Sequence, residues 1–146
     1  MLKILIAEDD LMIADMAEVF LLDAGYEVCG IARTVSEAIE LADRCNPDLA
    51  LLDMRLADGG VGTEIGARLA PHVGMGILYA SGNTSELVLT AADGHAALTK
   101  PYRSLDLLRA LELVTSLVVT GAAAPPYPRG FRILPPIANP ASVLAL

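Results

Sequence analysis

Basic residues are scarce in this chain of 146 residues, in which lysine occurs only twice. Ten lysines and arginines stand against eighteen aspartates and glutamates, for a formal net charge of −8. A surface of this sign repels nucleic acid and anionic membranes, so we expect neither as a direct partner. The length fits one domain with a single core.

Long apolar runs and targeting signals are also missing from the sequence. No stretch is long enough to cross a bilayer, and the N-terminus lacks a charged region followed by a signal-like segment. We therefore expect a soluble, cytoplasmic protein.

Cysteine is the third scarce residue type, since only Cys29 and Cys45 are present. They lack the C-x-x-C spacing of a zinc site, which excludes that kind of metal centre. We interpret both as small, buried apolar residues.

What the sequence does contain is a regular alternation of strand-like and helix-like segments. Strands are predicted at 2–7, 27–32, 49–52, 76–80 and 95–98. Helices are predicted at 11–24, 35–45, 61–69, 85–92 and 105–119, with Asp10, Thr34 and Ser104 as caps of the first, second and last. Five such repeats predict an α/β fold, a doubly wound parallel sheet with helices on both sides.

Polar residues follow four of these strands. Glu8 and Asp9 come after the first, Asp53 after the third, Ser81 after the fourth and Lys100 after the fifth. Ligands of doubly wound sheets bind at the carboxyl ends of the strands. We therefore expect these side chains to form one site.

The residue types at this edge suit a divalent cation and a phosphoryl group. Adjacent carboxylates repel one another unless a cation compensates, and Mg²⁺ prefers such oxygen ligands. A carboxylate fixed at a strand end, such as Asp53, can act as a nucleophile toward phosphorus. Lys100 can supply an ammonium group and Ser81 a hydroxyl to the transferred group.

Four segments together resemble the receiver domain of two-component response regulators: ILIAEDD at 4–10, PDLALLD at 47–53, ILYASG at 77–82 and TKP at 99–101. The resemblance implies a flavodoxin-like (βα)5 fold with five strands in the order 2-1-3-4-5. It also implies a single-domain response regulator, a phosphoprotein that signals by protein–protein contact and is not an enzyme.

The resemblance assigns a role to each site residue. Asp53 would accept phosphate from the phosphohistidine of a sensor histidine kinase or phosphotransfer protein. Ser81 and Lys100 would contact the phosphoryl group, so that the domain assists its own phosphorylation and dephosphorylation, and the Lys100–Pro101 bond would be cis. Mg²⁺ would be held by Glu8, Asp9, Asp53 and the main-chain carbonyl of Arg55.

One departure from the family's pattern concerns signalling. Receivers usually carry Tyr or Phe three residues before the lysine, and this chain has Ala97 there. The aromatic switch must therefore be absent or replaced, with Tyr79 and Tyr102 as weak candidates.

Other departures lie next to the phosphoacceptor. The loop after Asp53 is one residue longer than usual and contains Gly59-Gly60. Arg55 and Asn83 stand at positions that often tune phosphoryl lifetime. Arg55 is expected either to pair with a nearby carboxylate or to be solvated.

Alternative functions remain open or are disfavoured. Ala97 and the altered loop motivate a receiver-like interaction module that works without phosphorylation. A metal-dependent phosphatase is disfavoured because Arg55 stands where that chemistry commonly needs a second acid. A flavin carrier is disfavoured because the acidic segment after the first strand would repel the flavin phosphate.

The composition changes after residue 120. Six of the nine prolines lie in 121–146, where they disfavour a helix or a central strand, yet apolar side chains persist. We expect a receiver domain at 1–120 and a proline-rich extension at 121–146, either a disordered tail or an arm packed on the body or on a second subunit. A homodimer through this arm or through the last two helices is predicted. We interpret His72 and His95 as structural or surface residues.

Overall fold

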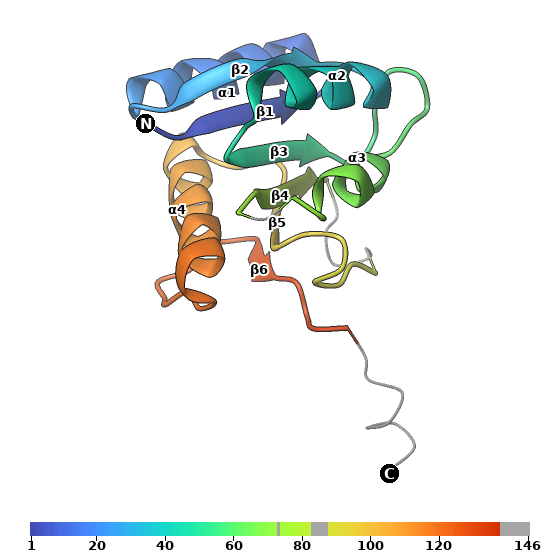
Figure 1. Ribbon diagram of the computed structural model, residues 1–146. Coiled ribbons are helices and arrows are strands. Elements are labelled where there is room, and N and C mark those ends of the chain that lie inside the picture. The colour runs from blue at the N-terminus through green and yellow to red at the C-terminus, as the bar shows by residue number, and fades with distance from the viewer. Residues whose placement is uncertain (73, 83–87, 138–146) are drawn as a thin grey trace.

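The computed structural model describes residues 1–72, 74–82 and 88–137. A six-stranded sheet runs through the molecule in the order β2-β1-β3-β4-β5-β6, which confirms the predicted order of the first five strands (Figure 1). The first five strands pair in parallel. The strands are β1 Lys3–Ala7, β2 Glu27–Ala32, β3 Leu49–Asp53, β4 Gly76–Ser81, β5 Ala96–Thr99 and β6 Phe131–Ile133.

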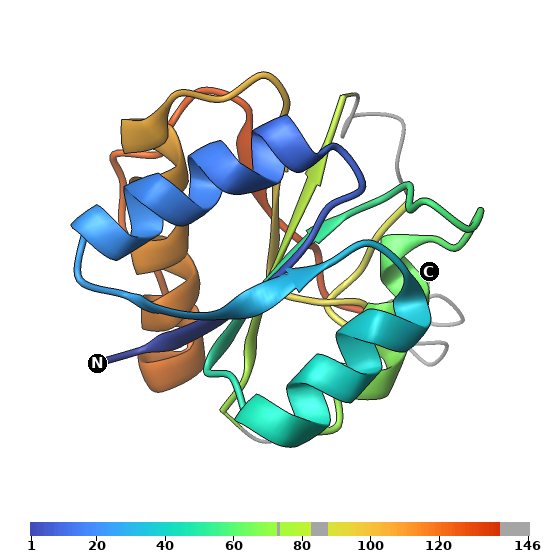
Figure 2. The same cartoon turned by 90° about the horizontal axis from the view of Figure 1, so that it is seen from above.

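Helices cover both faces of the sheet, as Figure 2 shows. They are α1 Leu11–Asp23, α2 Val35–Cys45, α3 Gly62–Leu69 and α4 Ser104–Thr120. One face packs against α1 and α4, and the other packs against α2 and α3. The doubly wound fold is therefore confirmed.

Strand alternation explains the two cores. Ile4 and Ile6 of β1 point toward α1 and α4, whereas Leu5 points toward α2 and α3. Successive side chains of a strand lie on opposite faces, so a strand covered on both sides must be apolar throughout. Because of this requirement, β1, β3 and β4 could be predicted from their continuous apolar runs.

Helix starts follow local capping chemistry. The Asp10 carboxylate accepts hydrogen bonds from the amides of Met12 and Ile13, and the Thr34 hydroxyl accepts one from Glu37, as predicted for these two caps. The cap predicted at Ser104 is wrong, because Arg103 occupies the cap position of α4 and Ser104 is already the first helical residue.

The helix predicted at 85–92 is not supported by the structure. Residues 85–87 lie outside the described residues, and residues 88–92 contain no helix. The amides there have other partners: the Asp93 carboxylate accepts the Thr90 N–H at 2.9 Å, and the Pro135 carbonyl accepts the Ala91 N–H at 2.8 Å. These bonds hold residues 88–93 as a connection to β5.

The segment after α4 adds a strand that the sequence did not predict. β6 pairs antiparallel with β5, and the flanking Leu134 is buried. The Leu134 amide donates to the His95 carbonyl, and the Gly130 carbonyl accepts the Thr99 N–H, both at 3.0 Å. Among strands, the prolines disfavoured only a central one, whereas β6 lies at an edge, where proline is tolerated nearby. Residues 121–137 are called the arm below.

Arg109 of α4 holds the arm from the other side. Its guanidinium donates to the carbonyls of Ala124 and Pro126 at 3.0 and 3.1 Å. The arm thus packs on its own chain, against α4 and along the outer edge of β5.

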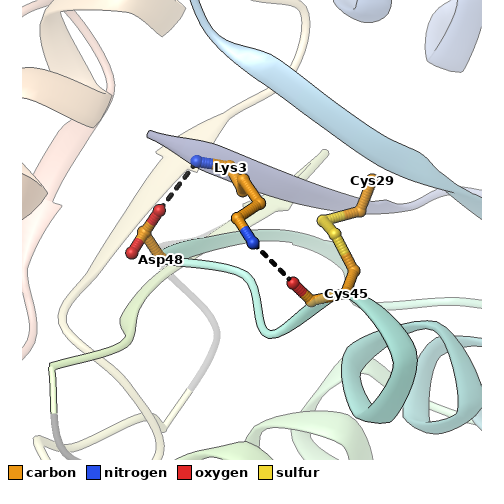
Figure 3. Close-up of a disulfide and its surroundings, with 4 residues drawn as sticks. All are labelled: Lys3, Cys29, Cys45 and Asp48. Atoms are coloured by element: carbon orange, nitrogen blue, oxygen red, sulfur yellow. Dashed lines mark hydrogen bonds between the residues drawn. A yellow bond between two sulfur atoms is a disulfide. The ribbon is translucent and has the colours of Figure 1, made fainter. Parts of the chain in front are cut away.

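The interpretation of the cysteines as separate buried residues is wrong, because Cys29 and Cys45 form a disulfide (Figure 3). Both are half-buried. The cause lies in β2, where the register with β1 passes from Val28 to Gly30 and leaves Cys29 as an extra, unpaired residue. This bulge breaks the alternation of β2, so Val28 and Ile31 pack on the same face. The bridge joins the bulge to the last residue of α2.

Candidate phosphoryl and metal site

An open cleft of about 790 Å³ lies at the carboxyl edge of the sheet. It brings together all six residues predicted for the site, which line it with parts of the neighbouring loops. Those residues are Glu8, Asp9, Asp53, Arg55, Ser81 and Lys100.

The acidic residues of the turn after β1 have different roles. The Asp10 carboxylate caps α1, while its own amide donates to Glu8 Oε2 at 3.3 Å. The Glu8 amide is bound by the Ala32 carbonyl of β2 at 2.9 Å. Backbone contacts therefore hold Glu8 at the cleft, and the Asp10 carboxylate is engaged by the helix, while Asp9 lines the cleft beside them.

Three carboxylates converge in the cleft. Glu8, Asp9 and Asp53 each offer an oxygen within 4.8 Å of the others, and Glu8 is only 5% exposed. A cluster of hard oxygen donors suits Mg²⁺, which binds through one or two carboxylates and keeps several waters. The donor set therefore fits the predicted ion.

Lys100 is the cation that contacts these carboxylates. Its Nζ donates to Glu8 Oε1 at 2.5 Å and lies 3.3 Å from Asp53 Oδ1. The Lys100 amide donates to the Ser81 carbonyl at 2.7 Å, and the following bond to Pro101 is cis, as predicted. This geometry places the ammonium group between two of the three carboxylates.

One ammonium group faces three carboxylates in this cleft. Burial, followed by the hydrogen-bonded Asp53, raises the pKa of Glu8 to about 7, although Lys100 opposes the rise. Burial alone would lower the pKa of Lys100, but its contacts with Glu8 and Asp53 outweigh that effect and raise it. Lys100 therefore stays charged, and the cleft favours binding of a further positive charge.

The loop after β3 closes one side of the cleft. Its Asp58 carboxylate accepts the Gly60 N–H at 3.0 Å, which closes a tight turn. Arg55 is exposed, and within the described residues it forms no ion pair, which fits the solvated alternative. Asn83, the other predicted tuning position, lies outside the described residues.

Gly62, the first residue of α3, is a site-shaping residue that sequence reasoning missed. A Cβ there would come within 2.3 Å of the Asp53 carbonyl oxygen, so α3 can begin this close to the end of β3 only at a glycine. The Gly62 amide also donates to the Met54 carbonyl at 3.1 Å. The sequence signal that could have indicated this role is a glycine that follows an apolar strand and its loop.

The aromatic group near Ala97 is Tyr79. The two residues are paired neighbours on β4 and β5, and both pack on the α2–α3 side of the sheet. Tyr79 is fully buried, and its hydroxyl donates to the Asp93 carbonyl at 2.7 Å. A Cβ on Gly66 would lie 1.9 Å from that hydroxyl, so the ring fills a slot left by the glycine. Tyr79 is thus a fixed core aromatic.

The comparison with protein families decides the assignment. The model of the response regulator receiver domain matches residues 4–112. The chain belongs to the response regulator receiver family. The predicted family is confirmed, and a role in two-component signalling is consistent with it.

Curated relatives of this receiver domain are regulatory proteins. It is 38% identical over 121 residues to the transcriptional regulatory protein PdtaR of Mycobacterium tuberculosis, covering 78% of this chain and 57% of the relative. It is 33% identical over 111 residues to the regulatory protein VanR of Enterococcus faecium, covering 73% and 46%. The chain thus spans about half the length of these relatives.

Solved structures carry the same fold. A CheY-like receiver domain from Methanospirillum hungatei JF-1 is 32% identical, with a TM-score of 0.69 over 77% of this chain and 91% of that one. The anti-anti-sigma factor PhyR of Bartonella quintana, a double mutant, is 25% identical, with a TM-score of 0.67 over 83% and 50%. Among the residues described here, no helix is both long and apolar enough to cross a membrane.

Proposed function

We propose that this receiver domain is a phosphoacceptor of a two-component phosphorelay, with Asp53 as the residue that takes the phosphoryl group. The observation that carries the proposal is the position of Lys100 Nζ between Asp53 and Glu8 in an acidic cleft. An ammonium group held at the acceptor carboxylate is placed to stabilise charge on an incoming phosphoryl group.

The expected reaction is a transfer from a donor phosphohistidine. A carboxylate oxygen of Asp53 attacks phosphorus, the P–N bond breaks, and its electron pair returns to the imidazole, which takes up a proton from solvent. The product is an acyl phosphate on Asp53. Lys100 binds one phosphoryl oxygen, and the Ser81 hydroxyl donates to another.

Mg²⁺ would be held by Glu8, Asp9, Asp53 and the Arg55 main-chain carbonyl, and when bound it supplies charge neutralisation for the phosphoryl oxygens. The chain accepts one phosphoryl group on itself and assists both this transfer and the later hydrolysis of the acyl phosphate, in which water takes the phosphoryl group as inorganic phosphate and Asp53 returns to the free carboxylate.

The donor is proposed to dock on α1. An apolar groove of about 330 Å³ runs between α1 and the segment after β5, and it shares Ile13 and Lys100 with the cleft. Met12 and Met16 on α1 are 73% and 53% exposed. A histidine that reaches Asp53 must come from a surface next to the cleft, and an apolar groove fits the helix face of a kinase or phosphotransfer protein.

Small phosphodonors test the proposal. Incubation with acetyl phosphate or phosphoramidate and Mg²⁺ is expected to add one phosphoryl group to the intact mass. Asp53→Ala abolishes the addition, whereas the matched control Asp58→Asn, a carboxylate in the adjacent loop, retains it. No added mass in the parent protein, or addition that survives Asp53→Ala, would overturn the proposal.

A second candidate is a receiver-like module that binds its partner without phosphorylation. It is favoured by Ala97 and the fixed Tyr79, because neither side chain can carry a ring movement outward from the cleft. Amide exchange separates the two candidates. The exchange rates are measured with and without phosphoramidate. If the rates change only at the cleft, the second candidate is supported, and if they also change in α4 and the arm, the first is supported.

A further inference from the structure

The Cys29–Cys45 bridge lies away from the phosphoryl cleft, and no part of the proposed transfer uses it. It joins β2 to the C-terminal end of α2, across 16 residues of sequence. Because Cys29 is the bulged residue of β2, its side chain is turned toward α2 instead of into a regular pair with β1. The bridge therefore depends on a specific irregularity of the strand.

The other end of α2 contacts the loop that borders the cleft. The Arg33 carbonyl, just before the α2 cap, accepts the Ala57 N–H at 3.0 Å. Val35, the first residue of α2, packs so tightly on Gly60 that a Cβ there would lie 2.7 Å from its Cγ2. Helix α2 is thus a rigid link, fixed at one end by the disulfide and touching the 54–61 loop at the other.

The pair is open to reagents. Both cysteines are half-buried, and an open hollow of about 270 Å³ beside β2 and α2 is lined by Gly30 and Arg44, the neighbours of Cys29 and Cys45. Because neither cysteine is sealed in the core, we expect a small thiol to reach the bridge.

The fold does not depend on the bridge alone. Lys3 of β1 donates through Nζ to the Cys45 carbonyl at 3.0 Å, and its amide donates to the Asp48 carboxylate at 2.8 Å (Figure 3). These contacts hold the exit of α2 after the sulfur–sulfur bond is cut. Reduction is therefore expected to loosen α2 against β2 while the sheet stays intact.

We propose that Cys29 and Cys45 form a redox-active pair that exchanges with dithiols, and that its state sets how firmly α2 holds the 54–61 loop. A thiolate of the dithiol attacks one sulfur, the Cys29–Cys45 bond breaks, and the second thiol of the reagent releases the mixed disulfide. Two electrons and two protons pass to the cysteines, and the dithiol leaves as its cyclic disulfide. The effect on phosphorylation of Asp53 rests on the proposed function.

The first test uses dithiothreitol in defined ratios of its oxidised and reduced forms. The full chain is equilibrated, quenched with iodoacetamide and weighed. The pair is expected to pass reversibly from no alkylated cysteine to two as the buffer becomes more reducing. A chain that carries two alkylated cysteines even at the most oxidising ratio would overturn the proposal, and so would one that never takes up label.

The second test measures amide exchange in the two states. Reduction is expected to speed exchange in α2 and at the Ala57 amide by roughly tenfold or more, because the bridge no longer restrains local opening. Amides of α4, on the opposite face, serve as the internal control. The variant Cys29→Ser/Cys45→Ser should match the reduced protein in both buffers, and equal exchange in oxidised and reduced protein would refute the link.

Phosphorylation is read out separately with phosphoramidate and Mg²⁺. The oxidised protein is expected to react several-fold faster, because its loop is already ordered. Equal phosphorylation rates in the oxidised and reduced protein would show that the state of the cysteine pair does not control phosphorylation. If neither state takes up phosphate, the proposed function fails, while the thiol and exchange results still decide the redox proposal.

Discussion

Tyr79 and Ala97 are neighbours in the core on the α2–α3 side of the sheet, where the Tyr79 ring occupies the space beside Ala97. They are register partners on adjacent strands, and the large ring on β4 lies beside the small alanine side chain on β5. The Tyr79 hydroxyl is tied to the Asp93 carbonyl, so this volume is filled by a fixed ring.

Ala97→Phe is expected to destabilise the protein by about 1–3 kcal/mol, because a second ring cannot fit beside Tyr79 without strain. The double variant Tyr79→Ala/Ala97→Phe should be less destabilised than the sum of its single changes, since the new ring can use the vacated space. Urea unfolding measures all four proteins. Additive losses would show that the two positions do not compete for one volume.

Lys100→Met is expected to lower the free energy of unfolding by about 1–3 kcal/mol at pH 8 in EDTA, because Glu8 loses its partner. Mg²⁺ should restore more stability to this variant than to the parent protein, since the cation replaces the missing positive charge. Arg103→Met is the control, because that arginine is 84% exposed in its pair with Asp106. Equal effects of the two variants would contradict the role given to Lys100.

Mg²⁺ itself is expected to raise the melting temperature, because binding to the folded state adds about 2.7 kcal/mol at a concentration of 100 times the Kd. Asp9→Asn should remove most of this gain, whereas Asp58→Asn should keep it. A thermal shift series in Mg²⁺ tests the prediction, and an undiminished gain in Asp9→Asn would contradict the assigned ligand.

His95 is expected to make stability depend on pH. Its Nδ1 accepts the Ile77 N–H at 3.0 Å, and burial lowers its pKa below the ordinary 6.5. In the window below 6.5 the unfolded chain binds more protons, so stability is complete above it and falls as the pH drops toward the folded-state pKa. The stability advantage of the parent protein over His95→Gln should therefore shrink between pH 7 and pH 5 in EDTA.

The exposed His72 provides the comparison for that measurement. The variant His72→Gln, which changes a histidine outside the core, is measured alongside as the control. A His95→Gln difference that stays constant with pH would show that protonation of this ring does not oppose folding.

Arg109→Ala is expected to loosen the arm, because the two carbonyls of Ala124 and Pro126 lose their donor. Amide exchange at Thr99 and Leu134 should speed up severalfold, with little change at β1 or β3. Arg103→Ala, at the N-cap of the same helix but paired with Asp106, should leave these amides unchanged.

The homodimer stays a prediction. Sedimentation of the full chain and of a version ending at residue 120 would test it.

The sequence predicted the parts that repeat a simple pattern. β1 and β3 are apolar on both faces, and α2 begins and ends at the predicted residues because Thr34 caps it and Pro47 cannot continue it. The predicted site residues line one cleft because the carboxyl ends of parallel strands lie at the same edge of the sheet.

The features that sequence reasoning missed depend on long-range contacts. The disulfide needs the bulge at Cys29. Gly30 inside the predicted strand is a local signal for such a bulge, but it does not identify Cys45 as the partner, and β6 needs the free edge of β5. The amides of Thr90 and Ala91 are taken by Asp93 and by the arm, which no helical pattern at 85–92 could indicate. The fit of Tyr79 beside Ala97 is likewise a matter of cross-strand register.

The bulge at Cys29 and the shortness of β6 have a shared consequence for association. β2 and β6 are the two outermost strands of the sheet. An outermost strand offers unpaired backbone groups on which another chain can build, unless it is twisted out of line or too short to template. Here β2 is irregular and β6 has only three residues, so both edges of the sheet disfavour pairing with a strand of another chain. Partners of this protein must therefore be selected by side chains on its helices and loops, so their specificity can change without disturbing the sheet.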